Sequence, residues 1–241
     1  MKKIILITGA SSDIGLKLID EIKDNYEKII LQYRTLSSEL ETIINNNKDK
    51  VIPLQSDFSD IESINKLIIT INKKGYLPNT IVHFPSPKFH FNRFNKESLD
   101  NFNQGWIICV QSIILILQAF IPNMKRNKYG RVVFMLTSCT TNIPPKYLSS
   151  YVTVKYALLG LMKSLSSEYS KNGILFNGVS PNMIETKFLS EIPKLLIEEN
   201  KKEMPNNRNI TIKETIRVIA YLLDEKNESI TGQNIAITGG K

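Results

Sequence analysis

The chain has 241 residues, of which 42% are hydrophobic, and this fits one α/β domain over residues 1–241 better than two small domains. Its two cysteines and two histidines are too few for a disulfide framework or a metal cluster, so no metal site is expected. The net charge of +8 indicates either a generic basic surface or one that attracts an anionic cofactor or an acidic carrier protein. No basic run is interleaved with aromatic residues, which argues against nucleic-acid binding.

Short β-rich runs alternate with longer amphipathic stretches along the chain. The alternation predicts a parallel sheet of seven strands, doubly wound with helices on both faces. The predicted strands are 3–8, 28–34, 51–54, 80–84, 131–137, 174–179 and 234–237, and the predicted helices are 14–24, 36–47, 60–74, 97–126, 149–171 and 212–224.

The N-terminal residues combine two lysines with an apolar run of only four residues before Thr8 and Gly9. We interpret this run as a first buried strand rather than a signal peptide and expect a cytoplasmic protein. The longest apolar run, 113–121, is interrupted by Gln118 and falls short of the ~18–20 residues that span a bilayer. It is interpreted as a buried helix face, and no membrane association is expected.

A candidate nucleotide-binding turn follows the first predicted strand and precedes a helix. Glycine lets a backbone approach a pyrophosphate, and a helix N-terminus offers free N–H groups and partial positive charge. Asp13 would repel a phosphate that it faced, so we expect its side chain to turn away and cap the helix. The candidate cofactor residues of this turn are Gly9, Ser11, Ser12, Asp13, Ile14 and Gly15.

The end of the second predicted strand carries no acidic residue but does carry Arg34. A carboxylate there would bind the ribose hydroxyls of NAD and repel a 2′-phosphate, whereas an arginine can bind a phosphate with two hydrogen bonds. The sequence therefore favours NADP(H) over NAD(H).

Tyr151 and Lys155 lie four residues apart and so share one face of any helix that contains them, with Ser138 thirteen residues upstream. A cation beside a phenol lowers its pKa from ~10 and makes it a usable general acid or base. With 9 tyrosines and 31 basic residues, about one such pair is expected by chance, so the spacing alone proves little.

The segment 188–210 contains Pro193, Pro205 and a run of charged residues. This composition is typical of an exposed, mobile helix pair that covers a site as a lid. A variable surface excursion is the alternative, and the sequence does not decide between them.

Taken in order along nearly the whole chain, these features resemble the short-chain dehydrogenase/reductase family, in particular its 3-oxoacyl-acyl-carrier-protein reductase-like branch. The motifs that carry the resemblance are Thr8-Gly9 to Gly15, Asp57, Ser138, Tyr151, Lys155, Asn177 to Pro181, Thr186, Thr231 to Gln233 and Gly239-Gly240. The resemblance implies a Rossmann-type fold and a homodimer or homotetramer formed through the long helices 97–126 and 149–171.

The resemblance also implies roles for single residues. Tyr151 would transfer the proton, Ser138 would orient the substrate oxygen, and Lys155 would bind the nicotinamide ribose and lower the pKa of the tyrosine. Asp57 would meet the adenine and Thr186 the nicotinamide carboxamide. The further candidate cofactor residues are Phe58, Pro181 and Ile184.

Two departures from the family are substantive. Where relatives carry an Asn-x-Ala-Gly run after the fourth strand, this chain has 83–87, His-Phe-Pro-Ser-Pro, and prolines stiffen that loop. His83 either closes the strand as a structural histidine or contacts cofactor or substrate. Cys109 stands where relatives place an asparagine that supports a proton relay to the lysine; it is interpreted as a small buried residue, with Gln111 or Ser112 as replacement polar groups. Asn182, where glycine is usual, tolerates the same backbone.

The leading hypothesis is an NADPH-dependent oxidoreductase that reduces a carbonyl to an alcohol, with Tyr151 as general acid. Its substrate is either a 3-oxoacyl thioester on an acyl carrier or a sugar or polyketide-like intermediate. The rival is a non-catalytic dinucleotide-binding relative, suggested by Cys109 and the rebuilt loop.

Overall fold

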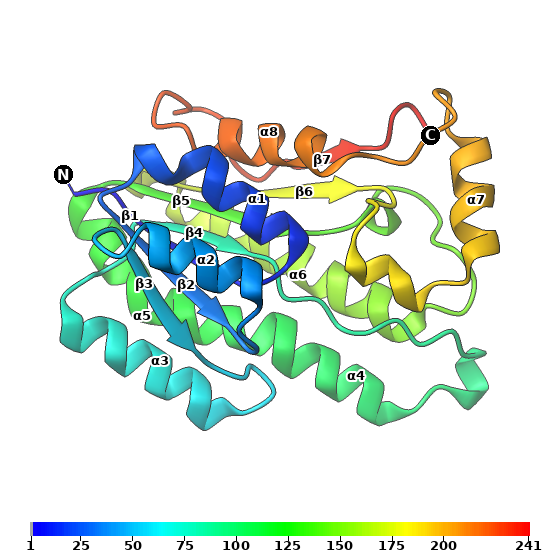
Figure 1. Cartoon of the computed structure of the whole chain (residues 1–241), viewed down its shortest axis with the longest axis horizontal. Helices are drawn as coiled ribbons and strands as arrows, with labels where there is room; N and C mark the ends of the chain where they lie inside the picture. The colour runs from blue at the N-terminus through cyan, green and yellow to red at the C-terminus, as the bar shows by residue number, and fades with distance from the viewer. Residues whose placement is uncertain (1) are drawn as a thin grey trace.

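A computed structural model describes residues 2–241, apart from the side chain of Glu191. Seven parallel strands form one sheet in the order β3-β2-β1-β4-β5-β6-β7 (Figure 1), which confirms the predicted fold class. The strands are β1 (Ile4–Thr8), β2 (Lys28–Tyr33), β3 (Val51–Gln55), β4 (Thr80–His83), β5 (Gly130–Met135), β6 (Ile174–Pro181) and β7 (Asn234–Ile237).

Helices cover both faces of the sheet, and each face has its own apolar cluster. The helices are α1 (Asp13–Ile22), α2 (Ser38–Asn46), α3 (Ile61–Lys74), α4 (Leu99–Gly105), α5 (Ser112–Asn127), α6 (Ser149–Tyr169), α7 (Lys194–Glu203) and α8 (Ile212–Leu223). Apolar residues of α1, α2 and α8 pack on one face, and those of α3, α5 and α6 pack on the other. The alternating outward directions of Cβ along a strand explain why Ile5 and Ile7 join one cluster while Ile4 and Leu6 join the other.

The predicted helix 97–126 is interrupted by a π-helical segment, Trp106–Gln111, between α4 and α5. Together they form a continuous helical stretch, Leu99–Asn127. An 18-residue window of this stretch has a mean hydropathy of 2.0, so by length and composition the stretch could cross a membrane. The prediction from the sequence that no apolar stretch here is long enough to span a bilayer was therefore wrong. Half of that window is buried inside the molecule, and its residues Ile113, Leu117 and Phe120 pack in the core, as in the core helix of a globular domain.

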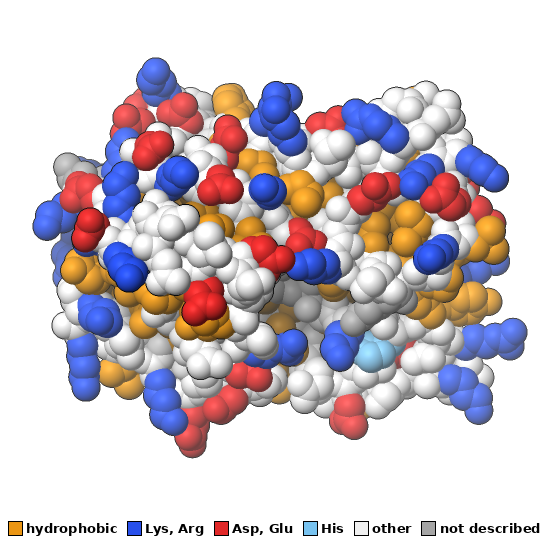
Figure 2. Space-filling model, viewed as in Figure 1, with side chains coloured by type: hydrophobic (Ala, Val, Ile, Leu, Met, Phe, Trp, Pro, Cys, Tyr) orange, Lys and Arg blue, Asp and Glu red, His pale blue; other side chains and the backbone are white. Residues whose placement is uncertain are grey.

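The segment 188–210 contains all but the first residue of a short helical turn, Lys187–Glu191, and the helix α7 at one edge of the molecule (Figure 1). Its base is fixed by a small apolar cluster of Ile184, Met204 and Ile210, and by a β-bridge between Ile184 and Ile210. The outer surface of α7 is exposed, as the charged composition of the segment predicted. The mobility of the segment stays a prediction. Basic and acidic side chains are interspersed over this face of the molecule (Figure 2).

Candidate active site

The carboxyl ends of β1, β4 and β5, which are neighbours in the sheet, bring the sequence-predicted residues together. Gly9 follows β1, His83 ends β4, and Ser138 follows β5 in a short helical turn, Ser138–Thr140. Tyr151 and Lys155 lie in the first turns of α6, which packs against that turn and against β6. Parallel strands place such loops at one edge, where ligands of doubly wound sheets bind.

The turn after β1 has the geometry of an anion site. Gly9 has φ +70°, a conformation that favours glycine, and a Cβ at Gly15 would lie 2.8 Å from the carbonyl oxygen of Ala10. Ser12 caps α1, because its Oγ accepts from the Gly15 N–H at 3.1 Å. Within residues 2–241 no hydrogen bond takes the N–H groups at the first two positions of α1, Asp13 and Ile14, so they fit a pyrophosphate.

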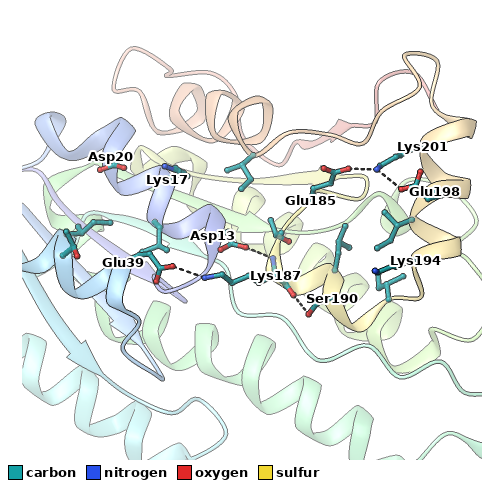
Figure 3. A pocket seen from close by; sticks show the side chains of 18 residues that line it. Asp13, Lys17, Asp20, Glu39, Glu185, Lys187, Ser190, Lys194, Glu198 and Lys201 are labelled. Atoms are coloured by element: carbon teal, nitrogen blue, oxygen red, sulfur yellow. Dashed lines mark hydrogen bonds and ion pairs between the residues drawn. The ribbon is translucent and has the colours of Figure 1, made fainter.

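Asp13 does not cap the helix, contrary to prediction, because Ser12 already does so. Its Oδ2 accepts a hydrogen bond of 2.6 Å from the backbone N–H of Lys187, and the Lys187 ammonium reaches Glu39 Oε1 at 3.1 Å (Figure 3). The Glu39 carboxylate is held at a pKa of about 2, first by a backbone N–H and then by Lys187. Lys187, the residue before the segment 188–210, is thus tied to both α1 and α2.

A buried glutamine fixes the nucleotide-binding turn from the neighbouring strand. Gln32, in β2, accepts from the Gly9 N–H at 2.8 Å through Oε1 and donates to the Ser56 carbonyl oxygen at 2.7 Å through Nε2. The sequence interpretation missed this residue, although a polar side chain inside an otherwise apolar strand was the available signal. The hydrogen bonds join β1, β2 and β3 at the edge where the adenosine end of a dinucleotide is expected.

The residues predicted for that adenosine end are close to one another. Arg34 is exposed just beyond β2 and makes no ion pair within residues 2–241, so its guanidinium can meet a phosphate. The Asp57 carboxylate accepts from the N–H and the hydroxyl of Ser59, which hold its pKa below the usual range. Phe58 is buried against His83, so only its backbone can face a ligand.

Tyr151 and Lys155 are both removed from water, with 6% and 1% of their surfaces exposed. The Lys155 ammonium lies 5.8 Å from the centre of the Tyr151 ring and donates to the Met135 carbonyl oxygen at 3.0 Å. Burial raises the pKa of Tyr151 and lowers that of Lys155, because both charged forms lose hydration. The lowering of the Tyr151 pKa that the sequence predicts is therefore outweighed by burial in this structure.

The hydroxyl groups that affect the Tyr151 phenol in this structure do not include that of Ser138, which the sequence predicted. The hydroxyls of Thr137 and Ser86 oppose the effect of burial on the pKa of that phenol, although neither of these described residues forms a hydrogen bond with it in this structure. Ser138 is half-buried next to Thr137, and no hydrogen bond of its hydroxyl is formed within residues 2–241. Its side chain is free to meet a substrate oxygen, which keeps its predicted role open.

His83 is a structural histidine. Its Nδ1 lies 2.8 Å from Thr8 Oγ1 and its Nε2 lies 2.9 Å from the Cys109 carbonyl oxygen, inside the π-helical segment. Burial lowers the pKa of His83 to about 3, so the ring is neutral, and the carbonyl partner fixes the proton on Nε2. Cys109 is fully buried with its pKa raised to about 12 by burial, as its interpretation as a small core residue required, and Ser112 is hydrogen-bonded within its own helix.

The remaining candidates lie where β6 leads into the segment 188–210. Pro181 ends β6, Ile184 packs its side chain into the small apolar cluster at the base of that segment, and Thr186 precedes the turn Lys187–Glu191. A cavity of about 1160 Å³ lies on the outer side of this segment, between α1, α2 and α7 (Figure 3). Asp13 and Thr186 line it, but Ser138, Tyr151 and Lys155 do not, so it is separate from the catalytic residues.

Known proteins of one family match this chain from end to end. The family model described as "Enoyl-(Acyl carrier protein) reductase" matches residues 9–241. A 3-oxoacyl-[acyl-carrier-protein] reductase FabG of Buchnera aphidicola is 24% identical over 99% of this chain and 97% of its own. The L-rhamnose 1-dehydrogenase (NADP(+)) of Thermoplasma acidophilum is 26% identical over 98% of this chain and 94% of its own.

Solved structures agree with the fold. YwfH, described as an NADPH dependent reductase involved in bacilysin biosynthesis, has a TM-score of 0.88 at 21% identity, covering 100% of this chain and 98% of its own. A 4-hydroxyisoleucine dehydrogenase complexed with NADH has a TM-score of 0.89 at 23% identity, covering 99% and 98%. Together with the matched family model, the nucleotide-binding turn and the Tyr151–Lys155 pair, these matches show that the chain belongs to the short-chain dehydrogenase/reductase family of NAD(P)-dependent oxidoreductases.

Proposed function

We propose that this protein is an NADPH-dependent reductase that converts a carbonyl to an alcohol, with Tyr151 as the general acid. The observation that supports it best is the buried phenol of Tyr151, held with its ring centre 5.8 Å from the Lys155 ammonium at the sheet edge that also carries the nucleotide-binding turn. A reduction needs a group that gives a proton to the carbonyl oxygen, and a phenol beside a cation that stabilises the resulting phenolate is such a group.

The cofactor would lie along the turn at Gly9 to Gly15, with Arg34 at its adenosine end and Thr186 near its other end. Bound NADPH supplies the hydride to the substrate carbon. Tyr151 gives its proton to the carbonyl oxygen, and Ser138 donates a hydrogen bond to that oxygen. Lys155 uses one of its three N–H donors on the Met135 carbonyl oxygen, and its charge stabilises the phenolate that remains.

Aromatic side chains support a substrate with an apolar flank. Phe89 lies with its ring centre 4.7 Å from that of Tyr151 and 4.6 Å from that of Phe188, at the start of the lid segment, while Phe91 lies 6.0 Å away. Rings so arranged favour an acyl chain or an aromatic or polyketide-like ring next to the carbonyl over a fully hydroxylated sugar. We infer that Phe89 moves aside when the substrate reaches the Tyr151 hydroxyl.

Replacing Tyr151 by phenylalanine tests the general acid. Tyr151→Phe should lower ketone reduction by roughly 100- to 10,000-fold, because only the proton donor is lost. NADPH should still protect the variant against heat. The assay compares a 3-oxoacyl thioester, an aryl ketone and an aldose. A variant with wild-type turnover, or a wild-type protein that binds no dinucleotide, contradicts the proposal, and reduction of the aldose alone contradicts the apolar substrate.

Cofactor choice has a separate test at Arg34. Arg34→Ala should weaken NADPH binding by roughly 10- to 100-fold through loss of charge-assisted hydrogen bonds to the 2′-phosphate, and leave NADH binding nearly unchanged. Titration of each dinucleotide followed by nicotinamide fluorescence gives both constants. Equal losses for the two cofactors contradict the role in phosphate binding.

We also propose a homodimer formed through α5 and α6. An elongated groove of about 680 Å³ between these helices is lined by apolar side chains such as Ile114, Leu117, Leu161 and Leu165. Leu165→Glu places a charge in that groove and should shift the protein toward the monomer in sedimentation velocity. An unchanged sedimentation coefficient contradicts this interface.

A further inference from the structure

The loop after β4 is anchored at both of its prolines. A Cβ at Gly9 would lie 3.4 Å from Pro85 Cδ, so Pro85 packs against the nucleotide-binding turn. A Cβ at Gly105 would lie 3.2 Å from Pro87 Cβ, so Pro87 packs against the end of α4. Proline fixes its own φ and restricts the residue before it. Ser86, between the two, therefore has little backbone freedom.

The Ser86 hydroxyl is buried at the catalytic tyrosine. Its Oγ is inaccessible to water and makes no hydrogen bond within residues 2–241, although buried hydroxyls are normally paired. The loop that carries it packs against α6 at Tyr151, because Pro87 and Val154 both lie against Gly105 and the ring centre of Phe89 lies 4.7 Å from that of Tyr151. From this place the Ser86 hydroxyl, like that of Thr137, lowers the pKa of the phenol against the larger effect of burial. The prolines thus hold the Ser86 hydroxyl, which has no hydrogen-bond partner among the described residues, near the Tyr151 oxygen, whose charge must change during the reaction.

Among the other described groups that face Tyr151, Lys155 supplies the positive charge that stabilises a phenolate. Lys155 is on the same helix, Cys109 is in the π-helical segment and Cys139 follows β5, and neither thiol carries a positive charge. Thr137, two residues after the end of β5, is the second hydroxyl, and its oxygen also accepts from the Cys139 N–H at 3.4 Å. An O–H donor on a phenolate forms a strong, charge-assisted hydrogen bond in such a water-poor site.

We propose that Ser86 is a positioning residue for proton transfer, whose hydroxyl donates to the Tyr151 oxygen and stabilises the phenolate. This inference rests on the proposed function. In the reduction the carbonyl carbon gains the hydride from NADPH and the carbonyl oxygen gains the proton of Tyr151. The O–H bond of Tyr151 breaks and leaves a phenolate, whereas the O–H bond of Ser86 stays intact. In alcohol oxidation the same hydrogen bond stabilises the phenolate that acts as the base.

The test is the pH profile of alcohol oxidation by Ser86→Ala. Loss of the donor should move the rising limb of kcat/KM by about one unit to higher pH, a roughly tenfold loss on that limb, with KM for the alcohol unchanged. Ser86→Thr keeps the hydroxyl and should restore the wild-type profile. Ser150→Ala is the matched control, because Ser150 is also buried with an unpaired hydroxyl but does not contribute to the pKa shift of the Tyr151 phenol.

Two further measurements keep the test decisive. If the alanine variant does not fold, Ser86→Cys keeps the volume with a poor donor and should show the same shift. The ultraviolet difference titration between each variant and its Tyr151→Phe partner reports the phenolate directly and needs no turnover, so it separates failure of this inference from failure of the proposed reductase. A Ser86→Ala profile and titration that match the wild type overturn the inference.

Discussion

Two buried cations lie at opposite ends of β5, and they differ in how many partners they have. Arg131, at the start of the strand, is 4% exposed, and Lys155 meets the last residue of the strand, Met135. Burial lowers the pKa of both. The arginine donates to four carbonyl oxygens, those of Gly130, Gly173, Glu225 and Asn227.

The number of partners separates a structural cation from a functional one. The Arg131 guanidinium ties β5 to the loops before β6 and after α8, and its ring of acceptors accounts for its burial. Lys155 has three N–H donors but makes one hydrogen bond within residues 2–241. A buried charge with spare donors is costly for the fold unless a ligand or a reacting group uses them.

The largest expected effect is on catalysis at Lys155. Lys155→Met should lower carbonyl reduction by roughly 100-fold or more, because the charge that stabilises the Tyr151 phenolate is removed. Its free energy of unfolding should stay the same or rise, since an apolar side chain of similar length replaces a poorly paired buried cation. Steady-state kinetics and urea unfolding give the two quantities. Lys163→Met, exposed on the same helix, is the control. A strongly destabilised Lys155→Met would remove the contrast with Arg131.

The second effect is on stability at Arg131. Arg131→Met leaves buried carbonyl oxygens without donors and should lower the free energy of unfolding by roughly 2–4 kcal/mol. Turnover of the folded variant should be retained, because the residue lies at the far end of β5 from Tyr151. Urea unfolding and NADPH-saturated turnover measure this, with Arg126→Met as a control exposed near the end of α5. If a fully folded Arg131→Met variant lost turnover, Arg131 would not be a purely structural cation and its contrast with Lys155 would fail.

Some of these features could be predicted from the sequence, and others could not. The alternation of strands and helices predicted the sheet, and the order of motifs predicted where Tyr151 and Lys155 meet the nucleotide-binding turn, because both depend on local periodicity and spacing. The contacts of Arg131 join residues up to 96 positions apart, and no local pattern announces them. The same holds for the hydroxyl of Ser86 beside Tyr151, and for Lys187 on Asp13, which reversed the expected helix cap.

A third buried basic side chain, that of His83, faces Lys155 but, unlike Arg131 and Lys155, remains neutral. Burial holds its pKa near 3, well below the ordinary 6.5, and the charge of Lys155 adds to the effect. The unfolded chain therefore binds one more proton than the folded protein between these two values. The stability that depends on neutral His83 is complete above pH 6.5 and is lost as the pH falls toward 3.

The measurement is urea unfolding near neutral and acid pH. Between pH ~7 and pH ~4.5 the wild type should lose roughly 2–3 kcal/mol through this histidine, at about 1.4 kcal/mol for each unit below its unfolded pKa. His83→Asn should start less stable, because the link from Thr8 to the Cys109 carbonyl oxygen is weakened, and should lose correspondingly less on acidification. His90→Asn replaces the other histidine and should keep the wild-type slope. Equal slopes for wild type and His83→Asn would mean that the site accepts a second positive charge beside Lys155, and the contrast between paired and unpaired cations would then fail at the catalytic end of β5.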